Sequence, residues 1–152
     1  MDTNYLLEKL GEDLKIELSL SSQNTCSVNF DDDEVIFEEN SRHLYILSVI
    51  GSATGRDGIC KSLLQANYLG IKTGNASICL DENTDEILLY KSFVGSLDYQ
   101  DFQDELVMFI KAVRFWKKWL DDPENAKEQL INENQKNSET LEDMIKNGMQ
   151  IV

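Results

Sequence analysis

The residues that could carry out catalysis form no recognisable catalytic motif in this sequence. Its single histidine, His43, has no serine or cysteine nucleophile motif beside it, which is typical of a surface residue in a turn. The three cysteines, Cys26, Cys60 and Cys79, lie far apart in apolar segments and form no Cys-x-x-Cys pair. We therefore expect small buried thiols, no disulfide and no enzymatic activity.

Two segments resemble cofactor or metal motifs only in part. The glycine-rich segment 51–57 lacks both the spacing and the Lys-Ser or Lys-Thr pair of a phosphate-binding loop. The run 81–85 matches the first positions of a calcium loop, but its sixth position is Glu86 rather than glycine and its twelfth is Ser92 rather than glutamate. The sequence predicts a flexible connection at the first segment, a hairpin turn at the second, and no cofactor.

Negative charge dominates the chain, with 28 acidic against 14 basic side chains and a formal net charge of −14. Such a surface repels phosphate backbones and anionic membranes, so we expect no nucleic-acid binding and no membrane insertion. A dense cluster at 31–39 could hold a cation weakly, but a solvated strand edge that resists edge-to-edge pairing explains it better. If charge steers a basic partner, Asp32 and Asp33 are the residues we expect to contribute.

Length and composition are those of one folded domain. The 152 residues are 41% hydrophobic, which is enough for a substantial core. No run approaches the ~18 consecutive apolar residues of a membrane span, and the N-terminus has no leader pattern. We therefore expect a soluble, cytoplasmic protein.

Hydrophobic periodicity predicts the elements that position these residues. Leucines at steps of three and four favour an amphipathic helix at 3–18, and alternating apolar residues favour strands further on. The third strand is apolar on both faces, which places it centrally. Asp57 can cap the second helix and Asp98 the longest one. The expected strands are 26–30, 34–39, 44–50, 76–80 and 86–93, and the later helices are 59–67 and the segment from Asp98 to Leu120.

This order predicts an α+β fold in which three helices accompany a five-stranded antiparallel sheet (α-β-β-β-α-β-β-α). We place this domain at 1–122. After Pro123, the stretch 123–152 is an acidic tail, expected to be loosely docked or mobile. It holds one weak helical cluster, formed by Leu141, Met144, Ile145 and Met149.

The layout from about Tyr5 to Leu120 resembles the class I type III secretion chaperones of the Tir-chaperone (CesT/SycE) family. The most specific match is Leu-Leu-x-Ala-Asn at 63–67, after a three-strand meander. The other matches are less specific one by one, and they support the resemblance because they follow one another in the family's order. They are the opening helix 6–11, the strand Cys26-Ser27-Val28 before an acidic hairpin, Ile87-Leu88-Leu89-Tyr90, and the closing helix with Phe109 and Trp116.

The resemblance implies a homodimer that binds the extended N-terminal segment of a secreted effector, keeps it competent for secretion and uses neither chemistry nor nucleotide. An export ATPase is a further partner of this kind of protein. The middle helix, which has two apolar stripes, independently suggests self-association, with extra core packing as the alternative. The implied dimer interface is Ile59, Leu63, Ala66, Asn67, Ile78 and Leu80.

An extended effector segment needs apolar grooves and partners for its main chain. We assign the grooves to exposed apolar residues of the first helix and early strands, and the main-chain pairing to a free sheet edge. Some residues in such a set are ordinary core. The predicted effector-binding residues are Leu6, Leu10, Val28, Phe30, Val35 and Phe37. The alternative function is an acidic binding module that inhibits a folded basic protein.

Overall fold

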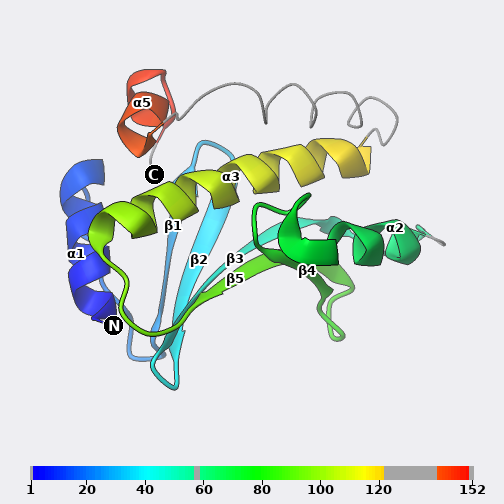
Figure 1. Ribbon diagram of the computed structural model, residues 1–152, viewed down its shortest axis with the longest axis horizontal. Coiled ribbons are helices and arrows are strands. Elements are labelled where there is room, and N and C mark those ends of the chain that lie inside the picture. The colour runs from blue at the N-terminus through cyan, green and yellow to red at the C-terminus, as the bar shows by residue number, and fades with distance from the viewer. Residues whose placement is uncertain (1, 57–58, 122–139, 151–152) are drawn as a thin grey trace. The chain divides into compact units, whose positions relative to one another are not determined.

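The computed structural model describes residues 2–56, 59–121 and 140–150 (Figure 1). The chain divides into two compact units. The first comprises Met1–Leu47, Ser92–Val107 and Glu139–Val152, and the second comprises Ser48–Lys91 and Met108–Ser138. Each unit is described by itself below.

The elements follow the predicted order. The five strands form one antiparallel sheet in the order β1-β2-β3-β5-β4, so the predicted α+β class and the central place of the third strand are confirmed. A further short helix, α5, forms at the predicted C-terminal cluster. The bounds are α1 Thr3–Leu14, β1 Thr25–Phe30, β2 Asp33–Asn40, β3 His43–Ser52, α2 Ile59–Ala66, the 3-10 turn η1 Tyr68–Gly70, β4 Ser77–Leu80, β5 Glu86–Phe93, α3 Tyr99–Asp121 and α5 Leu141–Lys146.

Helix α1 is shorter than the predicted 3–18. Lys15 takes a left-handed conformation (φ 58°), and its N–H bonds back to the carbonyl oxygens of Glu12 and Gly11, which ends the helix at Leu14. Gly11 allows the chain to turn there, because a Cβ at this position would lie 2.8 Å from the Ile16 carbonyl oxygen. Leu18 is nevertheless buried, as expected for a residue of the apolar side, although it lies outside the helix.

Two predicted features lie outside the described residues, namely the Asp57 cap of α2 and the segment around Pro123. The boundary between domain and tail therefore stays a prediction. The Asp98 cap of α3 is confirmed, since the Asp98 carboxylate accepts the Asp101 N–H at 2.8 Å. Among the described helices, none combines the length and apolarity needed to cross a bilayer.

The core of the first unit lies between the β1–β2 hairpin, α1 and the first turns of α3. Val28 pairs with Val35 and Cys26 with Phe37 across the hairpin, so one face of it is apolar. Phe102 of α3 packs against this face and is fully buried. Its ring centroid lies 6.4 Å from that of Phe37 and 5.8 Å from that of Phe93.

In the second unit, the β4–β5 hairpin places Ile78 opposite Leu89. Its turn is the run 81–85, which partly matches the sequence of a calcium loop. There the Asp81 carboxylate accepts the Asn83 N–H at 2.7 Å, and the Asp81 carbonyl accepts the Asp85 N–H at 3.0 Å. The predicted hairpin turn is therefore confirmed. The end of α3 is held within the same unit, where the Trp116 indole donates to the Lys72 carbonyl at 3.0 Å.

The Phe102 contacts yield a stability prediction. Phe102→Ala leaves a cavity among Phe37 and Phe93, so the free energy of unfolding should fall by about 3–5 kcal/mol. Urea unfolding followed by circular dichroism measures it. Gln100→Ala, at an exposed position of the same helix, should stay within about 0.5 kcal/mol of the parent. A Phe102→Ala cost below that of the control would contradict this description of the core.

Candidate functional site

The six predicted effector-binding side chains all lie in the core of the first unit. None of them is more than 1% exposed, so the prediction that they are exposed is wrong. The physical reason is that the alternation which marks an apolar strand face is the same whether that face meets a helix or a partner. Their role in binding an effector stays a prediction. The six are Leu6, Leu10, Val28, Phe30, Val35 and Phe37.

The opposite face of the same strands offers partly exposed apolar side chains. Ile36 of β2 pairs with Leu47 of β3, and both are half-buried, as is Tyr45 two residues before Leu47. Acidic Glu34 and Glu38 flank Ile36 on this face. The only sequence signal for this surface was the apolar character of the third strand on both faces.

β1 is a terminal strand of the sheet. A terminal strand presents main-chain donors and acceptors along its outer side, which an extended segment can pair with. The first unit therefore combines a sheet edge, half-exposed apolar residues and acidic neighbours.

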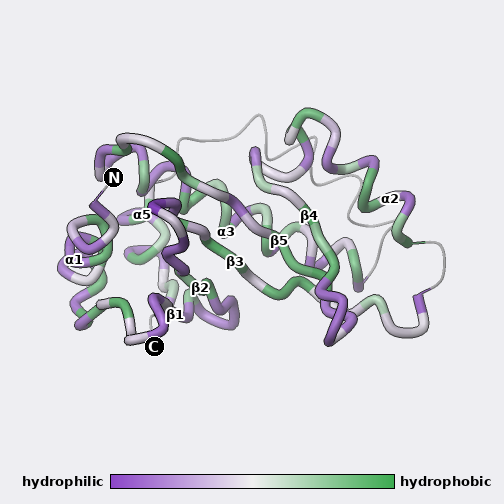
Figure 2. Tube along the Cα trace, turned by 90° about the horizontal axis from the view of Figure 1, so that it is seen from below, coloured by the Kyte–Doolittle hydropathy of each residue, from purple (hydrophilic) through white to green (hydrophobic). Residues whose placement is uncertain are grey.

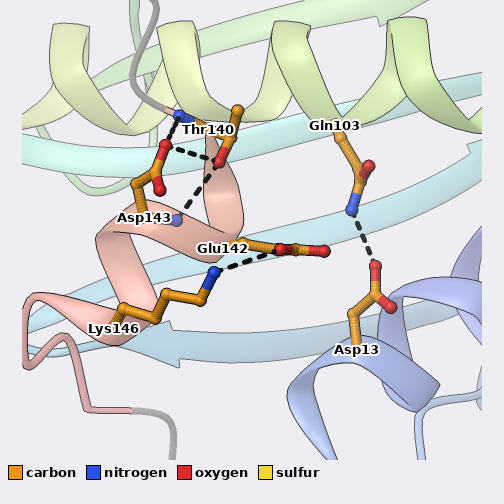
Figure 3. Close-up of polar contacts among 6 residues, drawn as sticks. All are labelled: Asp13, Gln103, Thr140, Glu142, Asp143 and Lys146. Atoms are coloured by element: carbon orange, nitrogen blue, oxygen red, sulfur yellow. Dashed lines mark hydrogen bonds and ion pairs between the residues drawn. The ribbon is translucent and has the colours of Figure 1, made fainter.

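Asp13 ties α1 to the start of α3 within the first unit. The Tyr99 hydroxyl donates to the Asp13 carboxylate at 2.6 Å. The Gln103 amide donates to the same carboxylate at 2.7 Å (Figure 3). Burial, and then the bond to Asp13, raise the pKa of Tyr99 above its ordinary value. These groups hold the helices in place, and the tyrosine stays protonated.

In the second unit, a groove of about 220 Å³ lies between α2 and the β4–β5 hairpin. Leu63 and Ile78 line it from the two sides, and both are buried within the chain. Its remaining lining residues are Ala53, Cys60, Leu64, Cys79, Leu80 and Ile87. Part of the predicted dimer interface thus forms the floor of this groove.

The structure distributes the predicted dimer residues between core and surface. Ala66, like Leu63 and Ile78, is buried, whereas Ile59 and Asn67 are half-buried and Leu80 is 49% exposed. Asn67 has a clear role within the chain: its amide accepts the Ile78 N–H at 2.7 Å and donates to the Ile78 carbonyl at 3.0 Å. It therefore anchors the end of α2 to β4.

A band of exposed apolar side chains runs along α2 and the loop that follows it. Leu64 is 70% and Tyr68 is 74% exposed, although both are large. Figure 2 shows hydrophobic stretches on α2 and on the loop that leads towards β4. Several large apolar side chains exposed on neighbouring segments of one unit often mark an interaction site. We call it the α2 patch, consisting of Leu64, Tyr68, Leu69, Ile71 and Leu80.

The cysteines are all free, but the prediction that they are buried is wrong: Cys26 and Cys79 are half-buried, and Cys60 is exposed on α2. Cys60 lines the groove together with Leu63, where solvent still reaches it. Burial raises the pKa of the Cys26 thiol to about 11, and burial together with Asp81 raises the pKa of Cys79. The latter two thiols are therefore poor nucleophiles at neutral pH.

Charge is divided unequally between the units. The described residues of the first unit carry 17 acidic and four basic side chains, whereas those of the second carry five acidic and eight basic ones. The described part of the chain contains no group of three or more His, Cys, Asp or Glu side chains arranged to hold a metal ion. Among the described residues, the excess negative charge is therefore concentrated in the first unit and spread over it rather than gathered in one metal-binding cluster.

Comparison with known proteins gives a family match. A family model described as the Tir chaperone protein (CesT) family matches residues 5–117. No curated protein matches the chain at a significant level.

Several solved structures share the fold at low sequence identity. A chain of the ExsC–ExsE complex has a TM-score of 0.68 and 21% identity, covering 78% of this chain and 96% of that one. A chain of the HopA1–SchA chaperone–effector complex has a TM-score of 0.65 and 16% identity, covering 75% and 91%. The Yersinia pestis type III secretion chaperone SycH, in complex with a fragment of YscM2, is also similar, with a TM-score of 0.57 and 22% identity over 73% and 97%.

The Asn67 bonds yield a prediction for the groove. Asn67→Ala leaves the partly buried main chain of Ile78 without both partners, which should cost about 2 kcal/mol of unfolding free energy. The Ile78 amide should also exchange faster with deuterium, as measured by NMR or mass spectrometry. Gln65→Ala, on the exposed side of α2, is the matched control and should change neither quantity. Unchanged exchange at Ile78 in Asn67→Ala would remove the anchoring role.

Proposed function

The chain belongs to the Tir chaperone protein (CesT) family, and from this premise we propose that it is a type III secretion chaperone for one or more effectors. It binds the N-terminal chaperone-binding segment of the effector in the cytoplasm, keeps it extended and aids its delivery to the export apparatus. It performs no catalysis and needs no cofactor. The family match over most of the chain is the observation that carries this proposal.

The surface of the first unit suits an extended segment. The outer edge of β1 can pair with the segment's main chain, while Ile36, Tyr45 and Leu47 can contact apolar side chains. In this proposal the six buried residues act as the rigid layer beneath the surface, and contact with the segment falls to their neighbours. The excess of acidic side chains favours a basic segment and speeds its approach.

The experiment that tests this function is purification of the tagged protein from its own cells, followed by mass spectrometry and limited proteolysis of what elutes with it. We expect one or two larger proteins, protected only over a stretch of their N-terminal region. Association of that fragment should slow as salt concentration rises, because screening weakens attraction to the acidic unit.

A different protection pattern supports the alternative. If the partner is protected as an intact folded domain, the chain is an acidic inhibitor of a basic protein and the secretion role falls. Recovery of no partner would also overturn the secretion role and leave the fold alone.

We also propose a homodimer formed through α2 and β4. The groove and the α2 patch offer a knob and a recess in one unit: Leu64 protrudes beside the hollow in front of Leu63 and Ile78. A two-fold interface needs such a self-complementary surface. Each copy would then bring its own effector-binding unit to the assembly.

Leu64→Glu combined with Leu80→Glu should convert the dimer into a monomer, because each glutamate would have to be desolvated at the interface. Size-exclusion chromatography with light scattering should change from twice the chain mass of 17.4 kDa to that mass itself. Val94→Glu, an equally exposed apolar position in the first unit, should leave the mass unchanged. A parent protein that is already monomeric, or a double variant that remains dimeric, would contradict this interface.

A further inference from the structure

The C-terminal segment 140–150 forms an ordered cap on the first unit. Helix α5 begins with a capping box, in which the Thr140 hydroxyl accepts the Asp143 N–H at 3.2 Å and the Asp143 carboxylate accepts the Thr140 N–H at 3.1 Å (Figure 3). The Thr140 N–H and the Thr140 hydroxyl both donate to the Asp143 carboxylate, and they hold the pKa of Asp143 below its usual range. The helix therefore has a defined start and a defined direction.

One face of this segment is apolar and buried. Leu141 and Met144, three residues apart, lie on the same side of α5, and Met149 follows after the helix. All three are less than one tenth exposed, whereas Glu142 and Lys146 on the other side are exposed and pair with each other. The apolar side therefore faces the protein.

After α5 the chain turns and meets the β1–β2 hairpin. Gly148, with a φ of 97°, ends the helix. The Asp31 N–H then donates to the Gln150 carbonyl at 2.6 Å, and the Gln150 N–H donates to the Asp31 carboxylate. Asp31 directly follows the edge strand β1. The segment thus pairs main chain to main chain at the end of the strand where we place the effector's main chain.

We propose that residues 140–150 occupy, in the free protein, part of the surface that the effector segment takes, and that effector binding displaces them. This inference rests on the proposed function. The segment has the chemistry that such a surface would accept, since it combines a short helix with a buried apolar side and a main-chain bond between Gln150 and Asp31 of the β1–β2 hairpin. It acts as a built-in competitor that covers apolar surface until an effector arrives.

Helix α5 has little stability of its own. A helix of six residues has too few internal hydrogen bonds to persist by itself, so α5 depends on the contacts of Leu141, Met144 and Met149. Its own net charge of −1 gives it no attraction to the acidic first unit, whereas a basic effector segment would gain from that charge. A covalent connection through 18 residues, 122–139, compensates by keeping the segment at a high local concentration.

A self-docked segment lowers the apparent affinity for the effector by the fraction of molecules that are open. With about ten closed molecules for each open one, the loss is roughly tenfold. Weakening the docking should recover this loss of affinity without any change in the surface that binds the effector.

The test uses the full-length chain and the effector fragment recovered by the co-purification above. Leu141→Ser combined with Met144→Ser removes the apolar face of α5 and should tighten fragment binding about tenfold. Glu142→Ser, on the exposed side of the same helix, should bind within twofold of the parent. Titration of a fluorescently labelled fragment gives both dissociation constants. Unchanged or weaker binding by the double variant overturns the inference.

A second measurement needs no substitution. Deuterium exchange of the parent protein should speed up at the amides of Asn147, Met149 and Gln150 when the unlabelled fragment is added. If the fragment binds and these amides keep their protection, the chaperone function stands and the displacement is overturned. If no fragment binds to the parent or to any variant, the proposed function fails, and the inference falls with it.

Discussion

Burial of one face of the β1–β2 hairpin is the constraint on which the rest of the first unit depends. Phe102 closes this face against Phe37 and Phe93, and the apolar residues of α1 complete the layer. Side chains committed to this layer cannot contact a partner without unfolding the unit. In our proposal, effector binding therefore falls to the surfaces that this layer does not use: the opposite sheet face, the edge of β1 and the hairpin end at Asp31.

The second unit meets a different requirement. Asn67 joins α2 to β4, and this junction leaves Leu64 and Tyr68 facing outwards beside a groove. Exposed leucine and tyrosine side chains are costly in water, which supports the homodimer that we propose through this surface. Among the described residues, acidic side chains are few in this unit and numerous in the first, which suits an apolar association surface in one unit and attraction of a basic segment in the other.

A chaperone for unfolded segments must keep apolar surface available without aggregating. A weakly bound segment of the same chain meets both needs, because its tether keeps it close to the surface and a ligand of higher affinity can replace it. In our proposal, Leu141, Met144 and Met149 hold the segment in place through apolar contact, and the acidic character of the unit favours a basic competitor. The same physical features that recruit the effector would therefore release the cover.

The sequence by itself determined the order of the elements, the central place of β3, the turn at Asp81 and the family, because these depend on local periodicity, turn chemistry and short motifs. It also identified α2 as the apolar helix. Only the tertiary structure decided that Val28 and Phe37 are core, that Cys60 is exposed and that α1 ends at Leu14. Apolar alternation shows that a strand face is buried, but not what buries it. Whether the covering element is a helix of the same chain or a partner depends on contacts between residues far apart in sequence, such as Phe37 with Phe102 and Asp31 with Gln150.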